Sequence, residues 1–244
     1  ETPNSLRSRA KARLVELLGE GEIGGLVDGG RSIYFDTTPL LNEQGKPNFK
    51  GVTWDIRTGL PDQPYVNGSP YVETPYAVEA QVKNDGSMIQ RTVMERNADA
   101  VRFVVRIPAL AYQDPDSGQI KPTNVTYAID VRNYGGAWEE RELIQIFNEK
   151  TTSPYQRATR VSLDPNGYPW DIRVRRVSKD SRKTELQNET WWESYTVLVE
   201  GKFTYPNSSF IYIEADAKQF GQSNIPERRF DVYGLKIQVP TNYD

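Results

Sequence analysis

The chain has 244 residues, a formal net charge of -3 and a mean hydropathy of -0.67. This length can bury a sizeable core and can hold one large all-β domain or two smaller ones. The low hydropathy favours exposed sheets and long loops over a thick core. Lys and Arg are scattered except at Arg7–Arg13 and Arg173–Arg176, so the basic footprint of a nucleic-acid-binding protein is missing, and we expect no nucleic acid partner.

The sequence contains neither His nor Cys. It therefore offers no disulfide, no thiolate metal site and neither the Ser-His-Asp nor the Cys-His arrangement of nucleophilic catalysis. No Walker sequence occurs, and the glycines do not have dinucleotide-binding spacing. We predict no cofactor, no metal and no enzymatic activity for these residues.

Membrane signals are also missing. The chain has no run of 18 apolar residues and no signal-peptide pattern, so we expect no membrane insertion by these residues. It starts at Glu1 instead of Met, and it ends on a run that is typical of a strand. We therefore expect a fragment of a longer polypeptide.

The first element has two interpretations. Over residues 5–18, five apolar side chains would lie on one face of a helix. Alternatively, Arg13–Leu18 begins a strand that enters the next segment. Glycine is so frequent between Gly19 and Gly30 that this next segment fits neither a helix nor an ordinary strand. We expect backbone at positive φ there, or a close approach by another segment.

From residue 31 onward the pattern predicts strands. Apolar and polar side chains alternate most clearly at Val101–Ile107 and at Val125–Val131, and the hairpin turn Asn133–Gly136 then leads into Trp138. Other strands are expected at residues 31–36, 143–147, 160–163, 170–177, 195–203 and 210–213, with long loops at 59–75 and 112–122. Strands at this spacing favour an antiparallel sandwich or barrel, so the predicted fold class is all-β.

Acidic side chains leave one catalytic possibility open. A glycosidase needs only two carboxyl groups at a suitable separation, and the candidates are Glu139, Glu140, Glu142, Glu193 and Asp171. Acidic residues beside strands are usually solvated partners of Lys or Arg, which is the interpretation that we adopt. The run Asp114–Gly118 lacks the residues of a calcium loop and is predicted to be a turn, as is Asp164–Gly167.

Two groups of side chains are candidates for a protein interface. Neighbouring residues on a strand point to opposite faces, so one of the adjacent Trp191 and Trp192 should enter the core while the other meets solvent, a second domain or a partner. The arginines of residues 173–177 alternate with apolar residues and indicate a solvated or interface-facing side of a strand. The candidate interface residues are Trp191, Trp192, Arg173, Arg175 and Arg176.

Four blocks of sequence together resemble one family. They are GEGEIGGLVDGGRSIYFDTTPLL at Gly19–Leu41, NFKGVTWDIRTG at Asn48–Gly59, TELQNETWWESYT at Thr184–Thr196 and GLKIQVPTNYD at Gly234–Asp244, the last following SKDS and KQFG. The blocks are similar in content and order to the N-terminal region of lambda-type phage tail tip proteins, the host-specificity protein J family. Residues 73–163 match mainly by strand pattern.

The resemblance implies an architecture. It favours the strand over the helix for residues 13–18. It implies a β-sandwich at residues 73–204, inserted into a second small β unit, a hub-type barrel, that the flanks 1–72 and 205–244 form together.

The resemblance also implies a function. The chain would be the N-terminal hub part of a structural tail tip protein, located at the virion tail tip and in the bacterial cytoplasm during assembly. The implied partners are two further copies in a trimer, neighbouring tail tip proteins and the tape-measure protein. A host outer-membrane receptor would be contacted only through a missing C-terminal region. The alternative from another class is a carbohydrate- or surface-binding β-sandwich with an exposed Trp as stacking platform.

Overall fold

The computed structural model describes residues 3–6, 8, 11–66, 70–216, 226–237 and 239. Within these ranges almost every regular element is a β-strand, and the 3-10 turn Gly29–Ser32 is the one helical element. None of the described elements is a helix long and apolar enough to cross a membrane. The strands are β1 (Lys11–Glu20), β2 (Ile23–Leu26), β3 (Ile33–Phe35), β4 (Thr38–Pro39), β5 (Val52–Thr58), β6 (Pro70–Gln81), β7 (Gln90–Val93), β8 (Ala100–Ile107), β9 (Ala111–Gln113), β10 (Ile120–Lys121), β11 (Thr123–Asn133), β12 (Glu139–Glu149), β13 (Tyr155–Ser162), β14 (Trp170–Arg176), β15 (Leu186–Gln187), β16 (Trp191–Glu200), β17 (Ser208–Asp216), β18 (Arg228–Phe230) and β19 (Val232–Leu235). The predicted all-β class is confirmed.

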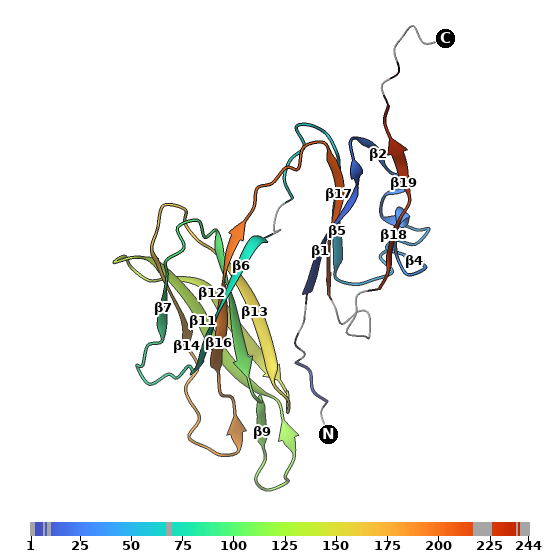
Figure 1. The fold of residues 1–244 in the computed structure, drawn as a ribbon. Coiled ribbons are helices and arrows are strands. Elements are labelled where there is room, and N and C mark those ends of the chain that lie inside the picture. The colour runs from blue at the N-terminus through green and yellow to red at the C-terminus, as the bar shows by residue number, and fades with distance from the viewer. Residues whose placement is uncertain are drawn as a thin grey trace. The chain divides into compact units, whose positions relative to one another are not determined.

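The chain divides into two compact units. The first contains residues 70–201 together with the described residues up to Ser8. The second contains the described residues of 9–69 and 202–244. Figure 1 shows β6 to β16 in the first unit, and β1 to β5 with β17 to β19 in the second. The second unit is therefore discontinuous in sequence, and most of the first lies between its two halves.

The first unit is an antiparallel sandwich of two four-stranded sheets, ordered β12-β11-β14-β7 and β13-β8-β16-β6. Among these eight strands, the first in sequence pairs with the last (β6 with β16), the second with the seventh (β7 with β14), the third with the sixth (β8 with β13) and the fourth with the fifth (β11 with β12). This nested pairing defines an eight-stranded jelly roll. The predicted β-sandwich is confirmed.

The core of the jelly roll comes from the inward side of each strand. On β11 the predicted alternation holds, because Val125, Tyr127, Ile129 and Val131 are all buried. Burial of a large apolar side chain contributes roughly 1.5–3 kcal/mol, so this alternation accounts for much of the unit's stability. Trp192 also lies in this core.

The first described residues pack onto the jelly roll. The backbone N–H groups of Ser5 and Leu6 donate to the carbonyl oxygen of Lys150 at 2.9 and 3.2 Å, and Leu6 contacts the core. The backbone N–H of Gln156 donates to Ser8 Oγ at 2.8 Å. The strand β1 begins only at Lys11. Of the two interpretations of residues 5–18, the strand is therefore correct.

The second unit depends on pairing between its two sequence halves. Strand β17 lies between β1 and β5, β18 pairs with β3, and β19 pairs with β2. Ile33 and Phe35 from one half share a core with Ile211 and Ile213 from the other. The described strands of this unit form separate sheets of three, three and two strands, so the closed hub-type barrel that we expected is not formed among them.

The glycine-rich segment is explained by close approaches between segments. A Cβ at Gly24 would lie 2.5 Å from Cβ of Tyr233 on the neighbouring strand β19. A Cβ at Gly59, whose φ is 91°, would lie 2.2 Å from the carbonyl oxygen of Gly21. Only glycine fits at such positions. The prediction made for residues 19–30 is confirmed.

Several boundaries differ from the sequence prediction. The predicted loop at 59–75 ends early, because β6 begins at Pro70. The stretch is predicted to be a loop because it is rich in Pro, Gly, Asn and Ser, but β6 is the edge of its sheet, where the missing N–H of proline is tolerated. In the predicted loop 112–122, β9 and β10 pair with each other. The predicted strand 31–36 is shortened to Ile33–Phe35 by the preceding 3-10 turn.

Gln63 joins three segments of the second unit through its buried side chain. Its Oε1 accepts a hydrogen bond from the backbone N–H of Gly59 at 2.9 Å. Its Nε2 donates to the carbonyl oxygens of Thr204, Tyr205 and Ser208 at 2.9, 2.7 and 2.9 Å. One amide thereby ties the segment that leads out of this unit to the segment by which the chain returns.

We predict that Gln63→Ala lowers the free energy of unfolding of the second unit by about 2 kcal/mol, because it leaves one buried N–H and several carbonyl groups without their partner. Hydrogen exchange measured by NMR should speed up in β17 and β5 but not in β11. The control Gln44→Ala, at an exposed position, should change stability by less than about 0.5 kcal/mol. Unchanged exchange in β17 would contradict this role of Gln63.

We also predict that Tyr127→Phe leaves stability unchanged or raises it by up to about 1 kcal/mol. The Tyr127 hydroxyl is buried without a hydrogen-bond partner among the described residues, and burial raises its pKa above the ordinary value. Removing this hydroxyl removes a desolvation penalty and no bond. Urea denaturation measures the effect, with the exposed Tyr134→Phe as control; a loss above about 1 kcal/mol would show that the hydroxyl has a partner.

Candidate functional site

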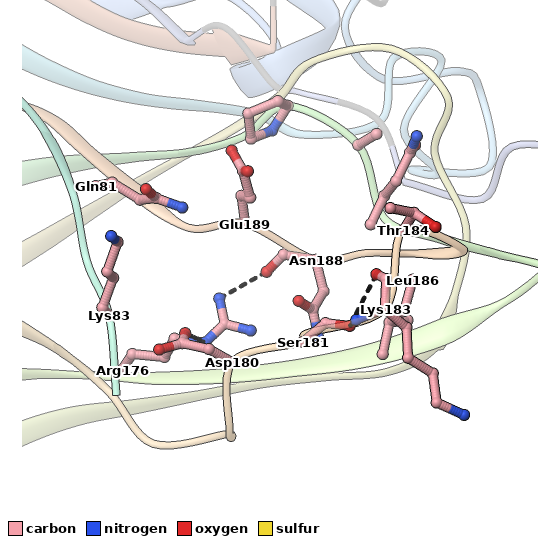
Figure 2. Close-up of a pocket in the computed structure, with 13 residues that line it drawn as sticks. Gln81, Lys83, Arg176, Asp180, Ser181, Lys183, Thr184, Leu186, Asn188 and Glu189 are labelled. Carbon is pink, nitrogen blue, oxygen red and sulfur yellow. Dashed lines mark hydrogen bonds and ion pairs between the residues drawn. The ribbon is translucent and has the colours of Figure 1, made fainter. Parts of the chain in front are cut away.

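The jelly roll has a pocket of about 760 Å³ at one end. Its lining comes from the end of β6 and from Lys83 two residues further on, from the turn after β8, from the end of β14 and from the segment that carries β15 (Figure 2). The lining residues are Gln81, Lys83, Pro108, Ala109, Arg176, Asp180, Ser181, Lys183, Thr184, Leu186, Gln187, Asn188 and Glu189. Residues 180 to 189 form most of this wall and fall largely within the blocks SKDS and TELQNETWWESYT.

A buried arginine fixes this wall. Arg176 Nη1 donates to the carbonyl oxygen of Asn188 at 2.6 Å and to Thr190 Oγ1 at 2.8 Å. Its Nε donates to the carbonyl oxygen of Ser178 at 3.1 Å and lies 3.0 Å from Asp180 Oδ1. Burial lowers the pKa of Arg176 from its ordinary value. The cost of burying this charge is offset by the carbonyl groups that it holds, so the loop is kept in one conformation.

A second cluster covers the outer side of the β12-β11-β14-β7 sheet, and we call it the arginine face. It consists of Asp130, Arg132, Trp138, Asp171, Arg173 and Arg175. The alternation of β11 and β14 places their apolar residues in the core and these polar residues on the opposite side. The register sets Asp130 opposite Arg173 and Arg132 opposite Asp171.

Two buried carboxylates organise the arginine face. Asp130 accepts hydrogen bonds from Arg173 Nε at 2.7 Å and from Arg175 Nε at 3.0 Å, and it raises the pKa of Arg175. Asp171 accepts from Thr92 Oγ1 at 2.7 Å and from Arg132 Nε at 2.9 Å. Each carboxylate is thus neutralised within the face, and neither lines the pocket.

Trp138 lies between two of these arginines. The guanidinium carbon of Arg132 is 4.4 Å from the ring centroid, and that of Arg173 is 4.1 Å away. Both distances are within the range of cation–π contacts. The indole is half-buried, whereas Arg175 at the edge of the face has a side chain 40% exposed. The face is therefore a rigid surface of Arg and Trp with few mobile charges.

The predicted interface residues occupy three different environments. Trp192 is fully buried and Trp191 is not, which confirms that the adjacent tryptophans divide between core and surface. Arg173 and Arg175 belong to the arginine face, but Arg176 turns into the pocket wall. Trp191 Nε1 donates to Glu189 Oε2 at 3.2 Å. An interface role stays a prediction, and Trp191, Arg173 and Arg175 are the residues placed to serve it.

The carboxylates that could have formed a glycosidase pair are mostly engaged elsewhere. Glu193 accepts from Gln156 Nε2 at 2.7 Å, Glu140 accepts from Arg175 Nη2 at 2.8 Å, and Glu139 lies 3.5 Å from Arg141 Nε. Glu142 lies on the exposed edge strand β12. Asp171 is the buried member of the arginine face. Most of these carboxylates are partners of Arg or of an amide, as the sequence interpretation held.

The two predicted turns are confirmed. Asp114 Oδ1 accepts the backbone N–H groups of Asp116 and Ser117, each at 3.1 Å. Its other oxygen pairs with Lys121, and this ion pair is the main cause of the lowered pKa of Asp114. The Asp164 turn is closed by Gly167 N–H at 2.9 Å. Among the described residues, no cluster of acidic side chains is suited to a metal ion.

Sequence reasoning missed three residues of these sites. Asp130 sits within a predicted strand, and alternation assigned it to the outer side, but only the register shows that it faces Arg173. The sequence places Trp138 after a hairpin turn but predicts no contact for it. Asn188 lies within the block TELQNETWWESYT, where no local pattern distinguishes it from its neighbours.

The family comparison agrees with the fold. The family model for the FNIII-A domain of tip attachment protein J matches residues 72–201, more than half of the chain. The chain therefore belongs to the tip attachment protein J family. In this member of the family, the strands of the FNIII-A domain are paired as a jelly roll.

Two curated proteins of the tip attachment protein J family resemble the chain beyond this domain. Tip attachment protein J of Escherichia phage SECphi4 is 34% identical over 248 residues, which cover 100% of this chain and 21% of that protein. Tip attachment protein J of Escherichia phage SECphi27 is 29% identical over 214 residues, which cover 88% of this chain and 18% of that protein. The chain spans about a fifth of the length of these relatives.

Solved structures are only distantly similar to this member of the tip attachment protein J family. A carbohydrate binding module from glycoside hydrolase family 9 (Cel9A) of Ruminococcus flavefaciens FD-1 has a TM-score of 0.33 and 9% identity. The alignment covers 57% of this chain and 100% of that module. A likeness this slight indicates no ligand.

We predict that Asp130→Ala lowers stability by about 2 kcal/mol, because it leaves Arg173 and Arg175 without their shared buried carboxylate. The loss should be smaller than for a fully buried pair, since Arg175 is partly solvated. Glu140→Ala removes an exposed carboxylate from the same Arg175 and should cost less than about 1 kcal/mol. Equal losses in the two variants, measured by urea denaturation, would contradict this account of the arginine face.

Proposed function

We propose that the chain is a structural component of a phage or prophage tail tip, the N-terminal hub part of a tip attachment protein. It acts in tail assembly and indirectly in host attachment and DNA delivery. The observation that carries the proposal is 34% identity to a tip attachment protein J along the whole chain. The proposed locations are the virion tail tip and, during assembly, the bacterial cytoplasm.

A non-catalytic role is supported by how the charged groups are used. Asp130 and Asp171, the buried carboxylates of the arginine face, are held by arginines. Carboxylates fixed in this way brace a surface and do not exchange protons with a substrate. We propose that this fragment is not an enzyme and that its work is to hold a shape against neighbouring subunits.

We propose a separate role for each of the two units. We assign the hub role to the second unit, the described residues of 9–69 and 202–244, and the β-sandwich role to residues 70–201 with the described residues up to Ser8. The expected bounds, 1–72 with 205–244 and 73–204, differ from these by a few residues and by the first described residues, which pack on the sandwich. The hub unit would build the ring of a trimer in the full-length protein. Neighbouring tail tip proteins and the tape-measure protein would be the other contacts. A host outer-membrane receptor would be reached through more distal parts of the longer protein.

The arginine face is the surface of the jelly roll best suited to a subunit contact. Trp and Arg are enriched among residues that dominate binding energy at interfaces. Along the same side of β12 lie Leu143 and Phe147, of which Phe147 is 77% exposed. These residues offer preorganised aromatic and guanidinium groups to a partner. Trp191 lies on the outer side of the other sheet and offers a separate aromatic contact.

Light scattering of the full-length protein over a range of concentrations tests the proposal, and we expect the mass of a trimer. The double variant Trp191→Ala with Arg175→Ala should raise the concentration of half-association at least tenfold, since losing two such residues costs about 1.4 kcal/mol or more. The control Gln119→Ala, at an exposed loop position of the jelly roll, should leave this concentration unchanged. A full-length protein that stays monomeric or dimeric refutes the hub role; an unaffected trimer in the double variant refutes only the interface.

A further inference from the structure

The pocket contains a buried polar side chain that the fold does not use. Asn188 is only 7% exposed, yet its carboxamide has no hydrogen-bond partner among the described residues. Its backbone oxygen is already held by Arg176. Figure 2 shows the side chain hanging between Arg176 and Ser181 inside the pocket. Among the described residues, Tyr127 alone has a fully buried side-chain polar atom without a partner, so the Asn188 carboxamide opens into the pocket. Its donor and acceptor are therefore available to a ligand group.

Other groups at the same wall are also uncommitted. Gln81, at the end of β6, is half-buried, and no described residue bonds to its carboxamide. Lys83, two residues further on, makes no ion pair within the described ranges and lies below Gln81 in Figure 2. Hydrogen bonds from Ser87 lower the pKa of Asp85, and the charge of Lys83 contributes to this shift. Arg176 Nη2 makes only a long contact of 3.4 Å with the carbonyl oxygen of Lys179.

The pocket therefore presents two carboxamides, the Lys83 ammonium group and part of a buried guanidinium. The two carboxylates of its lining already have partners within the chain, since Asp180 lies 3.0 Å from Arg176 Nε and Glu189 accepts a hydrogen bond from Trp191 Nε1.

This set of groups selects a class of ligand. A carboxamide offers one acceptor and two donors in a plane, which matches the N–H and C=O groups of an extended peptide. An ammonium group beside them favours a carboxylate. No aromatic residue is among the lining, so the stacking platform that suits a sugar ring is missing. The volume of about 760 Å³ falls in the range of small-ligand pockets.

We infer that this pocket binds a short acidic peptide segment of a partner protein. Asn188 and Gln81 hold the main chain of the segment, and Lys83 pairs with a carboxylate. Arg176 is a positioning residue that keeps the 178–190 loop in place. That the ligand comes from a protein rests on the proposed assembly function. The pocket and its unused polar groups are observed independently of that function.

NMR titration of this chain with a capped peptide, Gly-Asp-Glu-Asp-Gly, tests the inference. We expect shifts in the side-chain amide signals of Asn188 and Gln81, with binding at least fivefold weaker for the uncharged peptide Gly-Asn-Gln-Asn-Gly. Lys83→Ala should weaken binding of the acidic peptide at least fivefold. The matched control Arg182→Ala removes an exposed cation from the same loop, outside the lining, and should change binding less than twofold.

Gln81→Leu gives a second test that does not disturb the Arg176 contacts, and it should also weaken binding at least fivefold with an otherwise unchanged spectrum. Absence of shifts at millimolar peptide would overturn the inference. Tighter binding of an oligogalacturonate than of the acidic peptide would overturn it in favour of a sugar. A full-length protein that forms no trimer while the peptide still binds would refute the proposed function and leave the pocket assignment standing.

Discussion

The second unit exists only because strands about 200 residues apart pair with each other. Leu14 on β1 lies opposite Ile213 on β17, and Ile33 and Phe35 are buried against the same returning strand. Closing so long a loop costs conformational entropy, although this cost grows only slowly with loop length. The jelly roll between the halves reduces it further by holding most of the intervening chain in a folded unit. Gln63 then fixes the outgoing and returning segments with a single buried amide.

Two surfaces of the jelly roll differ in whether their polar side chains find partners within the chain. On the arginine face, Asp130 and Asp171, together with Glu140 at the edge, pair with three arginines, and Trp138 packs on two of them, so these charges are compensated within the chain. At the pocket, Arg176 donates hydrogen bonds to carbonyl groups of its own loop, but the carboxamides of Asn188 and Gln81 have no hydrogen-bond partner among the described residues. The first arrangement is suited to a rigid contact between subunits. The second is suited to a ligand that completes the missing bonds.

Local patterns predicted several parts of the structure correctly. Alternation on Val125–Val131 identified both the strand and its buried side, because a strand with one buried face has a period of two. The split between Trp191 and Trp192 follows from the same rule, whereas the Asn133–Gly136 turn follows from the turn preference of Asn and Gly. Loop boundaries were less accurate. The stretch near residue 70 was predicted to be a loop from its Pro, Gly, Asn and Ser residues, but its prolines are tolerated at an edge strand, and an edge position cannot be recognised in the sequence.

By itself the sequence determined the all-β class, the places where glycine is required, the absence of His and Cys chemistry and the family. These properties depend on residue type and on neighbours a few positions away. Only the tertiary structure decided the jelly-roll order, the open sheets of the second unit, the pairing of Asp130 with Arg173 and Arg175, and the burial of Arg176 beside Asn188. Each of these depends on which strands lie side by side and in which register, and long-range packing sets both.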